Sequence, residues 1–73
     1  MDEYYYYEIV CLDFFGFPAK NIKDTYTFTL TKKYDDGYYE YIDDFSSRPK
    51  VEQWIRSADH NTNIEIVYLF EKQ

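Results

Sequence analysis

Alternation of polar and apolar residues marks out the strands expected in this chain. The clearest is residues 25–33, where threonines alternate with aromatic or aliphatic side chains, as is typical of a half-buried strand. Residues 4–14 are rich in aromatic and β-branched residues and predict a first strand, which a loop over residues 15–21 ends. Residues 64–70 alternate again but have few polar positions on either side, which predicts a central strand or one paired across an interface.

The sequence around Asp35-Asp36-Gly37 predicts a hairpin turn between the second strand and a third. Two aspartates suit a type I turn, and Gly37 supplies the left-handed residue of the accompanying bulge. A three-residue loop pairs chemically compatible residues across the hairpin, namely Tyr34 with Tyr38, Lys32 with Glu40 and Leu30 with Ile42. A two-residue turn would place Leu30 opposite Asp43, so we expect the three-residue loop.

One helix is expected after the hairpin. Ser46-Ser47-Arg48-Pro49 has a serine cap and a proline suited to the first turn. An apolar stripe of about two turns follows at helical spacing, formed by Val51, Trp54, Ile55 and Ala58. The polar segment 59–63 ends the helix, with an asparagine as a left-handed C-cap.

These elements predict an α+β fold. We expect an antiparallel sheet of about four strands, in the chain order β-β-β-α-β, with one short helix packed on one face. Residues 1–73 are expected to form a single domain, since 73 residues, 9.0 kDa, leave no room for two cores. So small a core is marginally stable, and a high aromatic content (23%) and oligomerisation are two ways to compensate.

The composition and net charge of the chain limit the classes of function that we expect. Fourteen acidic residues against eight basic ones leave a formal net charge of −6, which disfavours binding to nucleic acid. The single cysteine excludes an internal disulfide or a cysteine-based zinc site. An acidic start and the lack of a long apolar stretch predict a cytoplasmic protein that does not bind membranes.

Catalytic chemistry is not indicated. His60 lies in a polar loop beside Asp59, and Cys11 lies in an apolar strand without a basic neighbour, so we expect a solvated imidazole and a buried, inert thiol. Motifs for phosphate binding, a catalytic triad or a metal are absent, and no cofactor is expected. A deep pocket lined by His60 and Asp59 would reopen the interpretation as an enzyme.

The feature with most functional content is an acidic, tyrosine-rich segment. It contains Asp35, Asp36, Tyr38, Tyr39, Glu40, Tyr41, Asp43 and Asp44. One interpretation is a solvated hairpin whose charges prevent aggregation. The other is a surface that imitates a phosphate backbone, because strand residues i and i+2 lie about 6.5 Å apart on one face.

Tyrosine density favours an interaction surface. The run Tyr4–Tyr7 must place rings on both faces of a sheet, and exposed tyrosines beside carboxylates suit a protein interface. Alternatively, the Phe15–Phe17 loop or a second copy of the chain covers the second face of the sheet. Trp54 is expected to join the hairpin tyrosines as an apolar anchor.

The last two-thirds of the chain resembles the small uracil-DNA glycosylase inhibitors of Bacillus phages. The likeness is carried by the segment 26–30, the turn Asp35-Asp36-Gly37, the sequence Tyr38-Tyr39-Glu40-Tyr41, the serine-capped helix and the alternating last strand. The resemblance implies a homodimer that blocks the enzyme as a DNA mimic. It also implies phosphate-like positions for Glu40 and Glu52, and a pocket for an enzyme leucine lined by Val51 and Trp54.

Our first hypothesis is therefore a non-enzymatic inhibitor that binds the basic groove of a host DNA-acting enzyme, most concretely uracil-DNA glycosylase. An anti-CRISPR or anti-restriction inhibitor of a nuclease is an alternative in the same class. A small oligomeric scaffold or regulator without an enzyme target is an alternative in another class.

Overall fold

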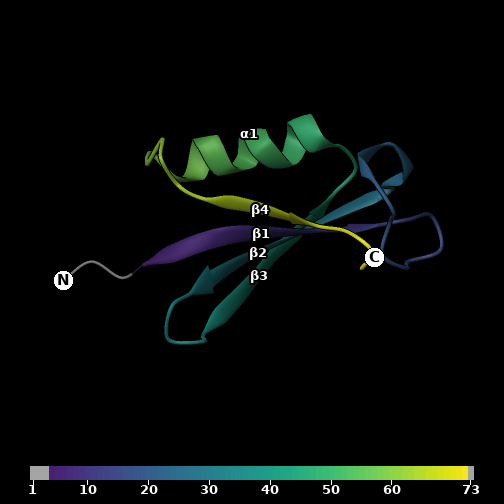
Figure 1. Cartoon of the computed structure of the whole chain (residues 1–73). Helices are drawn as coiled ribbons and strands as arrows, with labels where there is room; N and C mark the ends of the chain where they lie inside the picture. Colours follow the sequence, from purple (N-terminus) through teal and green to yellow (C-terminus); the bar gives the residue numbers. More distant parts are fainter. Residues whose placement is uncertain (1–3, 73) are drawn as a thin grey trace.

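The computed structural model describes residues 4–72. These residues form β1 (Tyr5–Leu12), a short 3-10 helix η1 (Ile22–Asp24), β2 (Thr27–Tyr34), β3 (Tyr39–Phe45), α1 (Arg48–Ala58) and β4 (Ile66–Leu69). The strands make one sheet in the order β3-β2-β1-β4, and α1 lies on one side of it (Figure 1). The predicted α+β class and the chain order β-β-β-α-β are confirmed.

The direction of β4 differs from the prediction. β1 pairs with β2 and β2 with β3 in antiparallel fashion, but β4 pairs with β1 in parallel, so the sheet is mixed. The cause is the crossover through α1, which returns the chain along the sheet before β4 begins. The chain therefore runs through β4 in the direction of β3 and β1, as in other strand–helix–strand units.

The position of β4 also corrects an expectation, because β4 is an edge strand and not a central one. Ile66 and Tyr68 are register partners of the buried Tyr7 and Ile9, on the side of the sheet that carries the core. Val67 and Leu69 point to the opposite face. Packing against the core thus accounts for the apolar residues on one face of β4. It does not account for the apolar residues Val67 and Leu69 on the other face, nor for the uncharged outer edge of the strand.

The hairpin between β2 and β3 has the predicted three-residue loop. Tyr34 and Tyr38 are joined by an N–H to carbonyl hydrogen bond of 2.9 Å, Gly37 has a φ of 94°, and Lys32 lies opposite Glu40. Beyond the pair of Thr31 and Tyr41, a bulge shifts the register, and Leu30 lies opposite Asp43.

The predicted pairing of Leu30 with Ile42 is therefore wrong. An extra residue in β3 places the half-buried Ile42 against the core, while the next residue, Asp43, stays exposed. A bulge thus reconciles the burial of an aliphatic side chain with the solvation of a carboxylate in the same short strand.

The helix begins as predicted and ends differently. Ser47 is the N-cap, and its side chain accepts a hydrogen bond from the Lys50 N–H, with Pro49 in the first turn. At the other end the cap is Asp59 in an extended conformation, with its N–H donated to the Ile55 carbonyl. Among residues 4–72 only glycines have positive φ, so the predicted left-handed asparagine cap is wrong.

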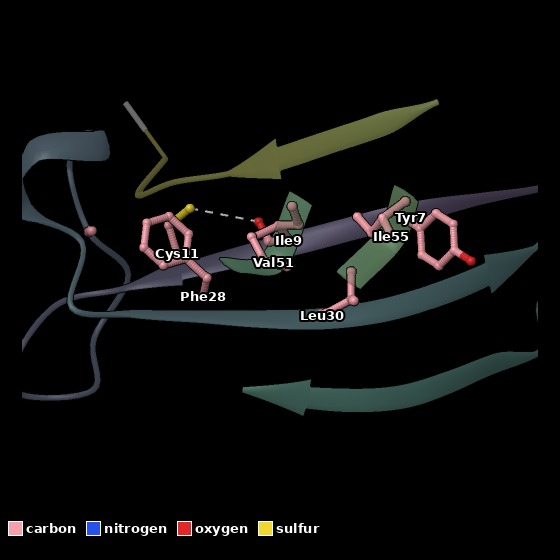
Figure 2. Close-up of a cluster of buried hydrophobic side chains, with 8 residues drawn as sticks. Tyr7, Ile9, Cys11, Phe28, Leu30, Val51 and Ile55 are labelled. Carbon is pink, nitrogen blue, oxygen red and sulfur yellow. Dashed lines mark hydrogen bonds between the residues drawn. The ribbon is translucent and has the colours of Figure 1, made fainter. Parts of the chain in front are cut away.

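The core lies between the helix and one face of the sheet (Figure 2). Its buried members are Tyr7, Ile9, Cys11, Ala19, Phe28, Leu30, Val51 and Ile55. Of the predicted helical stripe, two residues are buried, Trp54 is half-buried and Ala58 is exposed. Each large aliphatic side chain in such a core stabilises the fold by roughly 1.5–3 kcal/mol.

Within residues 4–72, no helix lies over the second face of the sheet (Figure 1). The threonines of β2 lie there as predicted, since Thr27, Thr29 and Thr31 pair with residues of β1 that alternate with the buried ones. We call this side the open face. Within the described part of the chain, no helix is long and apolar enough to cross a membrane.

Candidate protein-binding surface

The acidic segment forms one continuous exposed region at the β2–β3 hairpin. We call it the acidic hairpin surface; it consists of Asp35, Asp36, Tyr38, Tyr39, Glu40, Tyr41, Asp43 and Asp44, all of which are exposed. The turn is tied to the beginning of β1, because the Asp35 N–H donates to the Tyr4 carbonyl at 3.1 Å. The surface therefore lies at one end and one edge of the sheet (Figure 1).

The carboxylates of this surface are not neutralised by the lysines beside them. In residues 4–72, the ion pairs join Lys33 to Glu8 at 3.4 Å and Arg48 to Glu52 at 3.0 Å, and neither includes the hairpin. The Lys32 ammonium lies over the Tyr5 ring, 4.1 Å from its centroid. Because tyrosine rings and Glu8 hold the two lysines of β2, the negative charge of the hairpin stays uncompensated.

The surface spans both faces of β3. Tyr39, Tyr41 and Asp44 are paired with open-face residues of β2, whereas Glu40 is paired with Lys32 on the helix side. Opposite residues of an antiparallel pair point to the same face. The five carboxylates thus surround the hairpin and do not form a single straight row.

Three of these carboxylates accept hydrogen bonds within the fold. Asp36 accepts from the Tyr38 N–H at 2.9 Å, as expected in a turn, and Asp44 accepts from the Thr29 hydroxyl at 2.8 Å. Asp43 accepts from the N–H of the residue that follows it. In the described chain no hydrogen bond to the side chain of Asp35 or Glu40 is formed, so these two are the carboxylates free for a partner.

Glu52 does not belong to the exposed acidic set. Its carboxylate pairs with Arg48 and accepts a hydrogen bond from the Tyr68 hydroxyl, and the Tyr68 bond is the main reason its pKa is lowered. Burial and this bond to Glu52 raise the pKa of Tyr68 to about 12. The resemblance implies a phosphate-like position for Glu52, whereas in this structure its carboxylate is paired with Arg48 and hydrogen-bonded to Tyr68 within the fold.

The pocket for an enzyme leucine, which the resemblance implies at Val51 and Trp54, is only partly present. Val51 is completely buried and cannot line a surface pocket. Trp54 is half-buried and lines a hollow of about 390 Å³ between α1 and β3, next to Ile42 and Glu40. The structure thus brings Trp54 to the acidic hairpin surface but places Val51 beneath it.

His60 and Asp59 do line a hollow, of about 560 Å³, between the end of α1 and the segment leading into β4. The Asp59 carboxylate is already occupied, however. It accepts hydrogen bonds from the Tyr5 hydroxyl at 2.7 Å, the Tyr7 hydroxyl at 3.3 Å and the Asn61 N–H at 2.9 Å.

The Tyr5 hydroxyl, followed by the Asn61 N–H, holds the pKa of Asp59 below its usual range. A carboxylate kept ionised by three donors anchors the helix end to β1, which is a structural role. No hydrogen bond joins the Asp59 carboxylate to the exposed His60 in the described chain.

Cys11 is buried in the core, as predicted, and burial is the main reason that its pKa is raised. A raised pKa disfavours the reactive thiolate. Among residues 4–72, no group of three or more His, Cys, Asp or Glu side chains is placed to hold a metal ion.

The tyrosine run alternates between the two faces as expected. Tyr7 is buried and Tyr5 packs against the core, whereas Tyr4 and Tyr6 lie next to each other with ring centroids 6.5 Å apart. The Tyr4 hydroxyl donates to Glu65 at 2.7 Å. The run therefore contributes to the core and to the open face at the same time.

Sequence reasoning did not identify how the loop after β1 is held. Asp13 accepts hydrogen bonds from the N–H groups of Phe15 and Phe17, and Gly16 has a φ of 86°. Phe15 and Phe17 are 79% and 67% exposed, so they do not seal the open face as one alternative expected. An aspartate three residues before a glycine is the sequence signal for such a turn.

Comparisons of this chain with protein-family models, with curated proteins and with solved structures give no match.

Proposed function

We propose that this chain is a small non-enzymatic inhibitor that binds the basic DNA groove of a host DNA-acting enzyme through its acidic hairpin surface. Uracil-DNA glycosylase is the most concrete target. The observation that supports the proposal is a set of five exposed carboxylates, without an ion pair in the described chain, beside three exposed tyrosines.

The electrostatic part of the proposal follows from this lack of compensation. Clustered charges attract an oppositely charged groove over about one Debye length, near 8 Å at physiological salt, and raise the rate of association. All five carboxylates contribute to this attraction, and Asp35 and Glu40 can in addition accept direct hydrogen bonds from a partner, because their oxygens accept none within the described fold. Association should therefore slow as the salt concentration rises.

The apolar part of the proposal rests on the hairpin tyrosines. Tyr38, Tyr39 and Tyr41 are 63%, 62% and 57% exposed. Aromatic side chains carry much of the energy of protein interfaces when they are buried there. The hollow beside Trp54 offers an adjacent place for an apolar side chain of the enzyme.

A glycosylase assay on a uracil-containing oligonucleotide tests the proposal. We expect the wild-type chain to inhibit a bacterial uracil-DNA glycosylase. The double variant Asp35→Asn/Glu40→Gln should inhibit it about 10-fold less, because two unpaired charges are lost without loss of a described hydrogen bond. Raising the salt concentration should weaken the wild type more than the double variant.

The matched control is Asp24→Asn/Glu71→Gln, which removes the same charge from exposed positions outside the hairpin. This control should inhibit like the wild type. Equal weakening by both double variants would indicate a dependence on net charge only and would contradict a specific hairpin contact. Failure of the wild-type chain to inhibit would exclude the glycosylase as the target.

A nuclease remains the alternative target, as in anti-CRISPR or anti-restriction proteins, because its DNA channel presents the same chemistry. The same variants tested in a DNA-cleavage assay distinguish the two targets. An oligomeric scaffold without an enzyme target would leave both assays unaffected.

A further inference from the structure

The two edges of the sheet are protected to very different degrees. In the strand order β3-β2-β1-β4, β3 and β4 form the edges. β3 carries a bulge and three carboxylates, both of which discourage pairing with another strand. β4, with the sequence Ile66-Val67-Tyr68-Leu69, has no charge, no proline and a regular register with β1.

The backbone of β4 presents unpaired groups on its outer side. In a parallel pair, the N–H and C=O groups of alternate residues point to the neighbouring strand. The Tyr7 N–H donates to the Glu65 carbonyl at 3.0 Å, so Glu65, Val67 and Leu69 face β1. Ile66 and Tyr68 therefore direct their amides and carbonyls away from the sheet, where no other strand lies within the described chain.

We infer that this edge binds the β4 strand of a second copy of the chain, in antiparallel orientation about a two-fold axis. Such a pair closes on itself, which is the commonest form of a homo-oligomer. This inference does not depend on the proposed inhibitor function. Pairing of the two β4 strands would increase the surface area that this small chain buries.

The sequence of β4 fits itself in one particular register. With Val67 opposite the partner's Val67, Ile66 and the partner's Tyr68 exchange backbone hydrogen bonds, and Glu65 lies opposite the partner's Leu69. Moving the axis by one residue, to Tyr68, would place Glu65 opposite the partner's Glu71. Because like charges directly opposite one another are destabilising, the register centred on Tyr68 is disfavoured. Between the registers centred on Ile66 and Val67, we expect the second, because it pairs Ile66, Val67 and Tyr68 with residues of β4 in the partner, whereas the first pairs Tyr68 with Ile64, outside the strand.

The helix side of the sheet adds apolar surface to the same contact. The hollow of about 560 Å³ beside this edge is lined in part by Ile55, Ile64 and Ile66. Opposite residues of an antiparallel pair share a face, so both helices would lie on one side of the joined sheet. In the Val67 register the partner's Phe70 lies opposite Ile64, at this hollow.

The arrangement also keeps like charges apart. The acidic hairpin surface lies at the β3 edge, with β2 and β1 between it and β4 (Figure 1). The joined sheet would therefore carry one acidic hairpin surface at each outer edge, available to a target. A second copy thus fits the edge without opposing the strongest charges of the two chains.

Cysteine cross-linking tests the register. Val67 and the partner's Val67 would form a non-hydrogen-bonded pair with Cα atoms about 4.5 Å apart, within the range of a disulfide. We expect Val67→Cys to form a disulfide-linked dimer under mild oxidation. Leu69→Cys is the matched control, because its symmetry mate is several residues away, and it should remain uncoupled. A mixture of Glu65→Cys and Leu69→Cys should couple to each other.

Sedimentation equilibrium tests the association itself. The wild-type chain should have twice the mass of one chain, and Val67→Lys should have the mass of one chain, because two lysines would face each other at the axis. Thr31→Lys, on the same open face but in β2, should remain dimeric, and far-UV circular dichroism checks that both variants fold.

A monomeric wild type would overturn the inference, as would a dimer that Val67→Lys does not dissociate. Cross-linking of Leu69→Cys in place of Val67→Cys would overturn the register. A monomer whose Val67→Cys variant couples only to a different protein would show that the edge binds a foreign strand and not a second copy.

Discussion

Hydrogen bonds from tyrosine hydroxyls to carboxylates connect distant parts of this small fold. Asp59 at the end of α1 accepts from Tyr5 and Tyr7 of β1, and Glu52 in the middle of α1 accepts from Tyr68 of β4. Sequence alone indicated neither contact, since the residues in each pair are far apart along the chain. It did indicate that tyrosines suit such positions, with an apolar ring and a polar end.

The lowered pKa of Asp59 predicts acid-sensitive stability. Because the folded-state pKa lies below the unfolded value, near 3.9, the stabilisation is present above that value and is lost as the pH falls through the folded-state pKa. We expect the free energy of unfolding to decrease below about pH 4. The side chain of Asp59→Asn cannot titrate, so the free energy of unfolding of this variant should decrease less between pH 7 and pH 3.5. Urea unfolding at the two pH values measures this difference.

Asp24→Asn is a suitable control, because this exposed carboxylate accepts no hydrogen bond within the described chain. It should retain the pH dependence of the wild type. An Asp59→Asn variant with an unchanged pH dependence would contradict the assigned cause.

At the scale of the elements, local chemistry predicted the beginnings and turns well. The serine cap and proline placed the start of α1, and Gly37 placed the hairpin loop, because each acts within a few residues of itself. The bulge at Ile42 was not predicted. It depends on whether the core has room for that side chain, which is not a local property.

Removing the helix cap should destabilise the protein selectively. Ser47→Ala loses the acceptor for the Lys50 N–H and should lower the free energy of unfolding by about 1 kcal/mol. Ser46→Ala, which removes only an exposed contact with the Lys50 ammonium, should change it by less than about 0.5 kcal/mol. Thermal or urea unfolding measures both, and equal effects would argue against Ser47 as the cap.

The hairpin turn between β2 and β3 depends on the backbone conformation of Gly37. Gly37 has a φ of 94°, which a residue with a Cβ rarely adopts. Gly37→Ala should destabilise the protein by about 1 kcal/mol, although nothing lies within 4 Å of the added methyl group. Asp35→Ala in the same turn is the control and should cost less. A Gly37→Ala variant as stable as the wild type would contradict the backbone explanation.

The whole molecule is elongated, with extents of 41 × 24 × 18 Å, and one thin core supports it. Helix α1 covers only one face of the sheet, and the loop after β1 does not cover the other. The charge is distributed unevenly as well, with the uncompensated carboxylates at one edge and the uncharged strand β4 at the other.

Cys11 can report on the integrity of this core. The residue has no exposed surface, so its thiol should react with an aromatic disulfide reagent only when the chain unfolds. We expect the reaction in buffer to be at least about 100-fold slower than in concentrated urea. Ile55→Ala, which leaves a cavity in the core, should accelerate it in buffer. A rate equal to that of the unfolded chain would indicate that the core is open.

Local features of this protein were determined by its sequence alone. Strand alternation, the three-residue turn, the cap of α1 and the burial of Cys11 each depend on neighbours a few residues away or on the polarity of a single side chain. The acidic hairpin could be identified for the same reason, because its residues are consecutive.

Only the tertiary structure decided the direction and edge position of β4, the bulge in β3 and the pairing of each charge. Two acidic residues, Glu40 and Glu52, look equivalent in the sequence but differ in the structure. Glu52 is paired with Arg48 and accepts a hydrogen bond from Tyr68. Glu40 has no such partner within the described chain, because Lys32 lies over the Tyr5 ring. Such differences depend on contacts between residues that are brought together only when the sheet and helix pack.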